Sequence, residues 1–220
     1  MSGLGWRSRW FGGSVRRPPD TARWVVLDVE TTGLDMHHDH LLAIAATAVH
    51  IEDDVPPRLL LADSFEAVLQ HESRSIDKAN ILLHGIGVAE QRAGSPPREV
   101  LLAFEHWIGS SPLVGFHAQF DRSMIGRAMR QAVGRQLSGS WLDLAPVASV
   151  LYPEVGGRTL DDWLAHFHIE CAVRHQAAAD MLATAELLQR LWPAASAQGC
   201  ASFDGLSALG RHQRWLRHGA

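Results

Sequence analysis

Two carboxylates, Asp28 and Glu30, lie two residues apart near the end of an apolar run. The run from Trp24 is rich in β-branched residues and predicts a buried strand, in which alternate side chains point to one face. Neighbouring carboxylates repel one another unless a cation lies between them, and hard divalent cations prefer such oxygens. About 0.6 Asp-x-Glu triplets are expected from composition alone, so the pair by itself is weak evidence for a functional site. Its position at the end of a predicted buried strand is the stronger evidence. The pair predicts a cation site, with two solvated acids as the alternative.

A third acid, Asp121, follows a short apolar run at residues 112–116 and falls in the first turn of a predicted helix. The helix dipole favours an acid there, which is the alternative to a functional role. His175 and Asp180 are five residues apart at the start of a later helix. Side chains at that spacing lie about 140° apart on a helix, so His175 must precede the helix to reach Asp180. A mobile histidine beside acids suits a general base near neutral pH, and a surface histidine is the alternative.

The order of these groups is a stronger signal than any one of them. Together they supply four acids and one histidine, a set that can hold two divalent ions and a base. Two-metal sites catalyse in-line displacement at phosphorus. The pattern therefore predicts hydrolysis or transfer at a phosphate ester.

The elements that must position these groups alternate along the chain. Apolar runs predict strands at 24–30, 41–49, 59–69, 112–116 and 141–142. Helical spacing predicts helices near 75–83, 97–108, 118–133, 144–151, 160–167, 176–192 and 203–216. Three consecutive strands favour an antiparallel meander, and the later alternation favours parallel βα units. The predicted fold class is α/β, with a mixed five-stranded sheet and helices on both faces.

Composition limits the remaining choices. With 220 residues, 46% hydrophobic and 20% charged, the chain is typical of one globular domain. Its two cysteines, Cys171 and Cys200, argue against a disulfide framework and a cysteine-based zinc ribbon. The first 23 residues carry five Arg and one Asp, and residues 205–220 carry three Arg and no acid. Basic ends around an acidic body suit a protein that handles polyanions at its rim, with ordinary solvated charge as the alternative. No signal-peptide or membrane-spanning pattern is seen, so a cytoplasmic location is expected.

The chain resembles the DEDDh 3′–5′ exonucleases, the DnaQ-like family that includes the proofreading epsilon subunit of bacterial DNA polymerase III. The resemblance spans about residues 24–191 and rests on three motifs in order, at 26–34, 113–121 and 175–180. His84-Gly85-Ile86 and the stretch 141–145 are similar to two further family elements. The sister group carries Tyr-x3-Asp in the third motif. The single tyrosine here, Tyr152, is followed four residues later by Gly156, so that alternative fails.

The resemblance implies an RNase H-like fold with two divalent cations, Mg²⁺ or Mn²⁺. It implies that these ions are held by Asp28, Glu30, Asp121 and Asp180, with Asp28 bridging both and Asp121 acting mainly through water. It also implies that His175 deprotonates the attacking water.

The resemblance further implies a pocket for the 3′-terminal nucleotide, formed by Thr31, Leu34, His84 and Phe120. Leu34 and Phe120 are apolar groups that can pack on bases, although core packing is the alternative for Phe120. Residues 116–117 are Phe-His where the family usually has His-Asn. The imidazole of His117 can still donate a hydrogen bond, so His117 stays a candidate substrate contact. Ala43 stands where glutamate is frequent, and Gly87 stands where threonine is usual.

The sequence thus predicts a metal-dependent 3′–5′ exonuclease that hydrolyses phosphodiester bonds at single-stranded DNA 3′ ends and releases nucleoside monophosphates. Single-stranded nucleic acid is the expected partner, with DNA preferred over RNA. Three alternatives stay open: an RNA or short-oligonucleotide exonuclease, a polymerase-associated proofreading subunit, and a non-enzymatic adaptor. No convincing clamp-binding peptide is present, which favours a stand-alone enzyme, and the oligomeric state stays open.

The predicted organisation has three parts. A basic, flexible arm rich in Trp and Arg occupies residues 1–22. The exonuclease domain occupies residues 23–195, and a C-terminal helical extension occupies residues 196–220. The basic arm is expected to add electrostatic attraction for nucleic acid.

Overall fold

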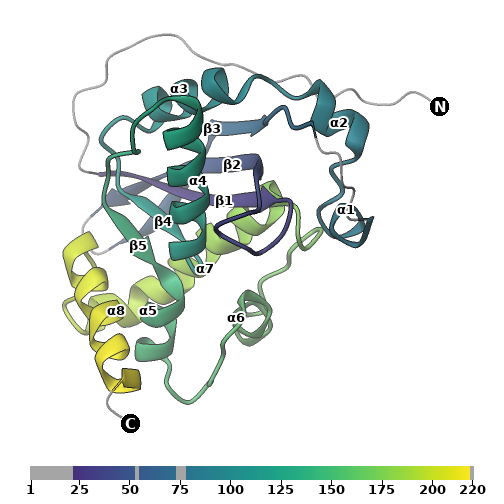
Figure 1. Ribbon diagram of the computed structural model, residues 1–220. Helices are drawn as coiled ribbons and strands as arrows, with labels where there is room; N and C mark the ends of the chain where they lie inside the picture. Colours follow the sequence, from purple (N-terminus) through teal and green to yellow (C-terminus); the bar gives the residue numbers. More distant parts are fainter. Residues whose placement is uncertain (1–21, 53–54, 73–77, 219–220) are drawn as a thin grey trace.

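A five-stranded mixed sheet forms the centre of the protein (Figure 1). The computed structural model describes residues 22–52, 55–72 and 78–218. The strands lie in the order β3-β2-β1-β4-β5. Their bounds are β1 Arg23–Thr31, β2 Leu41–Glu52, β3 Val55–Val68, β4 Leu113–Gly115 and β5 Trp141–Asp143. The first three strands pair antiparallel, whereas β4 pairs parallel with β1 and β5 pairs parallel with β4. The predicted α/β class and the predicted mix of strand directions are confirmed.

Helices connect the later strands and cover both faces of the sheet. Their bounds are α1 Lys78–His84, α2 Val88–Ala93, α3 Pro97–Ile108, α4 Gln119–Ala132, α5 Leu144–Leu151, α6 Leu160–Phe167, α7 Ala177–Ala197 and α8 Phe203–His218. Each predicted helix has a counterpart, although residues 75–77 of the first lie outside the described residues. The sequence did not predict α2, because six residues between Gly87 and Gly94 are too few to show a period. The longest helix, α7, continues past Pro193 because buried Ala195 keeps its last turn on the core.

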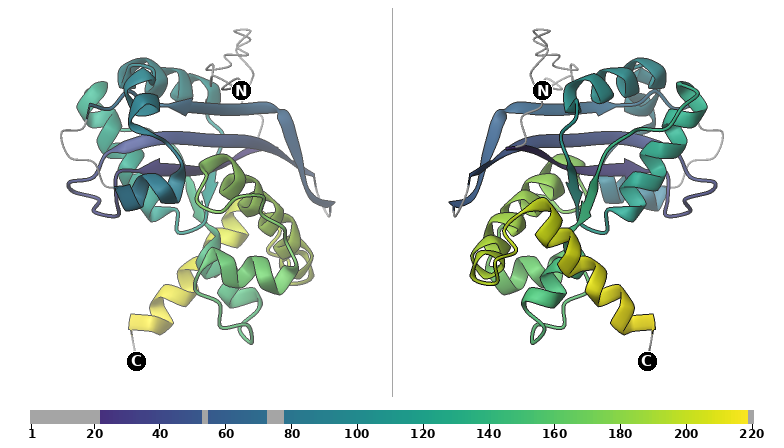
Figure 2. Two further views of the ribbon diagram at one scale, coloured as in Figure 1. Left: turned by 90° about the vertical axis from the view of Figure 1, so that its right-hand side faces the viewer. Right: turned by 90° about the vertical axis from the view of Figure 1, so that its left-hand side faces the viewer.

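The two faces of β1 supply two separate cores, because side chains alternate along a strand. Val25, Leu27 and Val29 pack with α3 and α4 on one face. Trp24 and Val26 pack with α5, α6 and α7 on the other. Figure 2 shows these helical layers on opposite sides of the sheet. Asp28 and Glu30 continue the row of Trp24 and Val26, so they emerge on the α7 side.

The C-terminal helix α8 packs against α5. Gly210 faces α5, where a Cβ atom would make an ordinary contact with the Pro146 ring at 3.4 Å. Leu206 is buried in the α7-side core, and the Phe203 ring meets Trp24 edge-on with centroids 5.5 Å apart. The division into three parts stays a prediction, and the basic arm lies outside the described residues. In the part of the chain that the structure describes, no helix has the length and apolarity needed to cross a membrane.

A buried arginine fixes the start of β1 against its neighbours. Arg23 donates from Nε to Asp63 of β3 over 2.8 Å and from an Nη atom to Ser111 over 2.8 Å. Its guanidinium also lies 4.8 Å from the centroid of the Trp107 ring. This contact set joins β1, β3 and the end of α3, so it holds the strand that carries Asp28 and Glu30.

Replacing Arg23 with alanine should destabilise the fold by about 3 kcal/mol, because Asp63 keeps a poorly solvated charge without its partner. Urea unfolding followed by circular dichroism measures the change. The control is Arg58→Ala on β3, an exposed site where the change should stay within about 0.5 kcal/mol. Equal effects of the two substitutions would contradict a role for the buried pair.

Candidate active site

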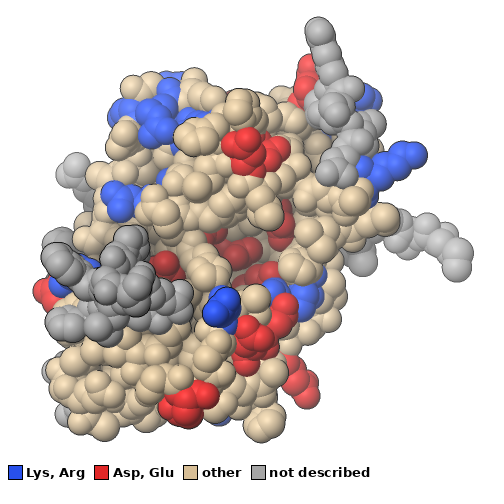
Figure 3. All heavy atoms as spheres, turned by 60° about the horizontal axis from the view of Figure 1, so that its bottom comes forward, with Lys and Arg blue, Asp and Glu red and all other residues tan. Residues whose placement is uncertain are grey.

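Four carboxylates from three elements meet at the end of β1. Asp28 and Glu30 come from the strand, Asp121 from the first turn of α4, and Asp180 from the first turn of α7. Asp121 is 4% exposed and Asp180 is 6% exposed. In Figure 3, acidic side chains line a hollow near the middle of the visible face. The structure therefore brings together all four acids that the sequence predicted.

The proximity of these acids is evident in their pKa values. Burial raises the pKa of Asp28 well above its ordinary value, and the charges of Asp121, Glu30 and Asp180 raise it further. Burial, followed by the charge of Asp180, raises the pKa of Glu30 to about 8. Burial likewise raises the pKa of Asp121 to about 8, with a contribution from the charge of Asp143. Burial is the largest cause of each shift, and neighbouring carboxylates add to it.

A tight turn brings α4 close enough to β1 to place Asp121. A Cβ atom on Gly115 would lie 3.2 Å from the Asp121 carboxylate and 3.3 Å from Ala118, so this position favours glycine. His117 adopts a left-handed backbone with φ of 57°. Its N–H donates to the Asp143 carboxylate over 2.9 Å, and the same carboxylate accepts from the N–H of Ala145 at the start of α5. Asp143 therefore fixes the turn that carries Asp121.

The third motif forms a turn just ahead of α7, as the spacing predicted. His175 adopts φ of 62°, and its N–H donates to the Asp180 carboxylate over 3.0 Å. Asp180 also forms an ion pair with Arg174, and its carboxylate lies 3.5 Å from the Cys171 sulfur. The His175 side chain is exposed, so its imidazole is open to solvent beside the acid cluster.

The chemistry of the donor set fits divalent cations. The site offers four carboxylates, and burial together with neighbouring negative charge raises the pKa values of Asp28, Glu30 and Asp121, which favours a bound cation. As the described side chains stand, no three His, Cys, Asp or Glu groups are arranged to hold an ion. Asp180 is engaged by Arg174 and by the His175 N–H. Ion binding by all four acids therefore requires Asp180 to exchange its pairing with Arg174.

A cavity of about 160 Å³ lies beside Glu30 and includes His84 in its wall. His84 is 3% exposed, and its Nδ1 atom accepts from the Ile86 N–H over 3.0 Å. Burial lowers the pKa of His84, which favours the neutral ring with its proton on Nε2. This buried Nε2 atom has no protein partner among the described residues, so it offers a donor to a bound molecule. Ala43 lines the same cavity, at the position where the family often has glutamate.

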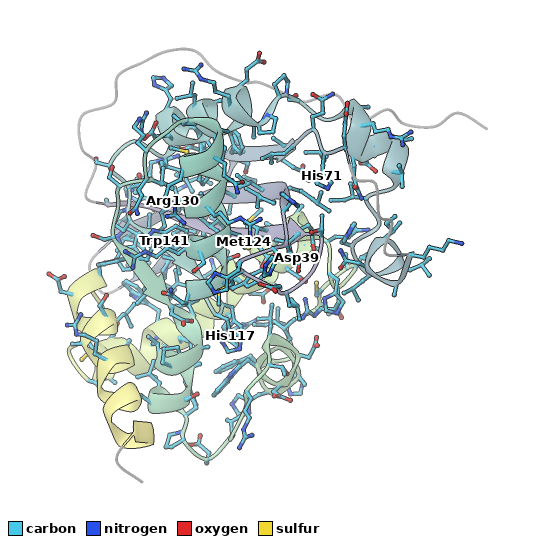
Figure 4. All side chains as sticks on the ribbon, viewed as in Figure 1. Asp39, His71, His117, Met124, Arg130 and Trp141 are labelled. Carbon is cyan, nitrogen blue, oxygen red and sulfur yellow. The ribbon has the colours of Figure 1, made fainter. Side chains whose placement is uncertain are left out.

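The other predicted substrate contacts differ in how exposed they are and in whether their polar atoms already form hydrogen bonds. Leu34 is 86% exposed and is free to contact a base, whereas Phe120 is half-buried against the core on the α3 and α4 side. Thr31 is buried and donates its hydroxyl to the Gly33 carbonyl over 2.6 Å. His117 bonds through Nε2 to the Arg158 carbonyl over 3.0 Å, and Figure 4 places it beside α6.

Sequence reasoning missed the supporting roles of three residues. Arg174 bridges Asp161 of α6 and Asp180 of α7. Asn80 of α1 donates to the Thr31 carbonyl over 2.8 Å, which ties α1 to the end of β1. The third residue is Asp143, which fixes the turn before α4. In the sequence, Arg174 could have been noticed because it directly precedes His175, and Asp143 because it lies between a predicted strand and a predicted helix.

Comparison with known proteins identifies the family. The exonuclease family profile, RNase_T, matches residues 25–188, which include all three motifs. The chain belongs to this exonuclease family. The predicted resemblance is therefore confirmed.

Curated relatives are much longer than this chain. A DNA polymerase III subunit epsilon-like protein of Rhodobacter capsulatus is 30% identical over 91% of this chain and 28% of its own length. A PolC-type DNA polymerase III of Bacillus subtilis is 29% identical over 84% of this chain and 12% of its own length. The chain thus spans less than a third of either relative.

Solved structures share the fold at lower sequence identity. Escherichia coli exonuclease I in complex with a dT13 oligonucleotide has a TM-score of 0.66 and 17% identity, covering 80% of this chain and 42% of that protein. Cell-death related nuclease 4 also has a TM-score of 0.66 and 17% identity, covering 77% of this chain and 63% of that protein. These likenesses confirm the predicted RNase H-like architecture.

The raised pKa of Glu30 makes the stability of the metal-free protein depend on pH. Between its unfolded pKa of about 4.3 and its folded pKa of about 8, the unfolded chain loses a proton that the folded chain keeps. Stability therefore falls as pH rises through this window. In chelator, Glu30→Gln should raise Tm by about 4–8 °C at pH 8, corresponding to about 2 kcal/mol, and hardly at all at pH 4.

Thermal unfolding of both proteins at the two pH values measures this effect. Glu154→Gln, at an exposed position, is the matched control and should leave Tm nearly unchanged at both pH values. An equal change for Glu30→Gln at pH 4 and pH 8 would argue against a raised pKa of Glu30 in the folded protein.

Proposed function

We propose that this protein is a divalent-metal-dependent exonuclease that removes nucleoside monophosphates from the 3′ ends of single-stranded DNA. The observation that carries the proposal is the convergence of four mutually repelling carboxylates beside an exposed histidine. Membership of the exonuclease family supports it. The likeness in fold to exonuclease I, whose structure holds a dT13 oligonucleotide, adds support for a single-stranded substrate.

Each residue at the site has a distinct task in the proposal. Asp28, Glu30, Asp121 and Asp180 hold two Mg²⁺ or Mn²⁺ ions. When bound, such ions supply Lewis acidity and charge neutralisation at the phosphate. His175 accepts the proton of the water that attacks phosphorus, and its place on a turn leaves its imidazole free to do so. Arg174 releases Asp180 when the site is loaded, while its pairing with Asp161 keeps the turn anchored to α6.

The terminal nucleotide occupies the space around the end of β1. Exposed Leu34 packs on the terminal base, since an apolar side chain in water gains from that contact. His84 offers its unpartnered Nε2–H to the nucleotide from the cavity beside Glu30. Thr31 and Phe120 shape the pocket from behind, because both are at least half-buried. His117 acts indirectly, by linking the turn before α4 to the carbonyl of Arg158.

A second candidate is proofreading within a DNA polymerase assembly. The names of the Rhodobacter and Bacillus relatives favour it, since both refer to DNA polymerase III. An exonuclease of RNA or short oligonucleotides would use the same acids. Matched 3′-labelled DNA and RNA strands, digested with the purified protein, separate these substrates.

Chelation should abolish hydrolysis, and Mg²⁺ or Mn²⁺ should restore it, because the acid cluster needs cations for charge balance. Asp28→Ala should fold and should bind Mn²⁺ at least tenfold more weakly by calorimetry. Digestion of a 3′-labelled strand with and without chelator measures the first effect. Full activity in excess chelator would contradict the two-metal proposal.

His175→Ala should lower kcat by about 10²-fold or more, because a positioned base contributes that much to proton transfer. Folding and Mn²⁺ binding should be unchanged. His106→Ala, an exposed histidine on α3, is the control and should stay within a few-fold. Near-normal turnover of His175→Ala together with a large loss in His117→Ala would move the base to His117.

A further inference from the structure

A second groove lies on the outer side of α4. Its volume is about 560 Å³, and its wall includes Arg122, Arg127, Arg130, Met36, His37 and Trp141. No acidic residue is among the described residues that line it. The groove is therefore basic, in contrast to the acidic hollow at the end of β1.

Two of its arginines form a row along one face of α4. Arg122, Gly126 and Arg130 are spaced four residues apart, so they share a face of the helix. Eight residues of helix span about 12 Å, so the two arginines present separate charges along the groove. Gly126 has no side chain, so it adds no bulk between the two arginines.

The charges of Arg122 and Arg130 are available to a ligand. Both side chains are exposed, and within the described residues neither forms an ion pair with a carboxylate. Arg127 differs, because its two Nη atoms donate to the carbonyls of Met36 and His38 over 3.1 Å each. Arg127 thus holds the loop that forms the opposite wall, and the other two arginines face the groove.

Apolar surfaces lie beside these charges. Trp141 of β5 is half-buried, and Met36 is 40% exposed. Figure 4 labels Arg130 on α4 and Trp141 on β5, the two elements that frame this end of the groove. Basic groups that alternate with an aromatic ring are the combination by which proteins bind single-stranded nucleic acid, with phosphates on the charges and bases on the ring.

The groove shares two chain segments with the candidate active site. Gln119 and Arg122 line the groove and directly flank Phe120 and Asp121 in the chain. The loop that carries Leu34 also supplies Met36 and His37 to the groove wall. The start of α4 and the loop after β1 thus contribute residues both to the candidate active site and to the groove.

We propose that this groove binds the sugar–phosphate backbone of the substrate strand on the 5′ side of the terminal nucleotide. Arg122 and Arg130 contact phosphates, and Trp141 and Met36 contact bases. The inference rests on the proposed function and extends it, because it assigns the groove to upstream nucleotides. It makes the preferred substrate a strand of several nucleotides instead of a dinucleotide.

The test compares Arg122→Ala/Arg130→Ala with the matched double variant Arg58→Ala/Arg98→Ala, whose arginines are exposed and lie outside the groove. Binding of a labelled 12-nucleotide DNA strand is measured in chelator at several salt concentrations. At about 0.1 M salt, the groove variant should bind at least tenfold more weakly. Its plot of log affinity against log salt should be shallower by about 1.4, which is 0.7 for each lost phosphate contact. The matched variant should follow the wild-type protein.

Hydrolysis distinguishes failure of the groove from failure of the proposed function. With Mn²⁺ present, the groove variant should show a tenfold higher KM for the 12-nucleotide strand, an unchanged kcat, and normal cleavage of a dinucleotide. If the wild-type protein cleaves strands and the groove variant behaves like the matched control, the groove assignment is wrong. If the wild-type protein cleaves no strand, the proposed function is wrong, while the salt dependence still reports on the groove. Loss of binding to a polyglutamate probe with unchanged DNA binding would assign the groove to an acidic protein and overturn the proposal.

Discussion

The fold must hold four carboxylates close enough to repel one another, and the rest of the structure follows from how it does so. Each acid comes from an element that is fixed by other contacts. The strand that carries Asp28 and Glu30 is buried between two hydrophobic cores, and Arg23 secures its start. The helices that carry Asp121 and Asp180 are long, and their buried faces pack on opposite sides of the sheet. The hydrophobic packing of the two cores therefore offsets the repulsion between the carboxylates at the site.

Much of the fold could be predicted because its signals are local. The β-branched run at β1 and the helical stripe of α7 are each long enough to show a period. The acids could be predicted as a set because their order in the chain matches a family pattern. What the periodic pattern does not reveal is which side chains pair outside the regular spacing of a helix or strand. Neither the Arg174–Asp180 ion pair nor the Asn80–Thr31 hydrogen bond leaves a periodic trace.

Backbone strain is also concentrated near the motifs. Three residues other than glycine have positive φ among those described, and all three are histidines: His117, His168 and His175. Two of them directly precede helices that carry acids of the site. A left-handed residue turns the chain sharply, so the helix can begin within a few residues of the strand or loop before it. The hydrogen bond from the His175 N–H to the Asp180 carboxylate depends on that turn. A continuous helix across residues 175–180 would place the two side chains on different faces.

The ion pair between Arg174 and Asp180 also changes the net charge of the acid cluster in the folded protein. Small zinc domains stay unfolded until their metal arrives, because nothing else in the chain offsets the repulsion of their ligands or provides a core. Here an arginine of the chain supplies one positive charge to the acid cluster, and two cores stabilise the elements around it. The cores around the site are therefore formed by the chain alone. In the proposed function, ions would bind to a cluster whose negative charge the chain itself already reduces.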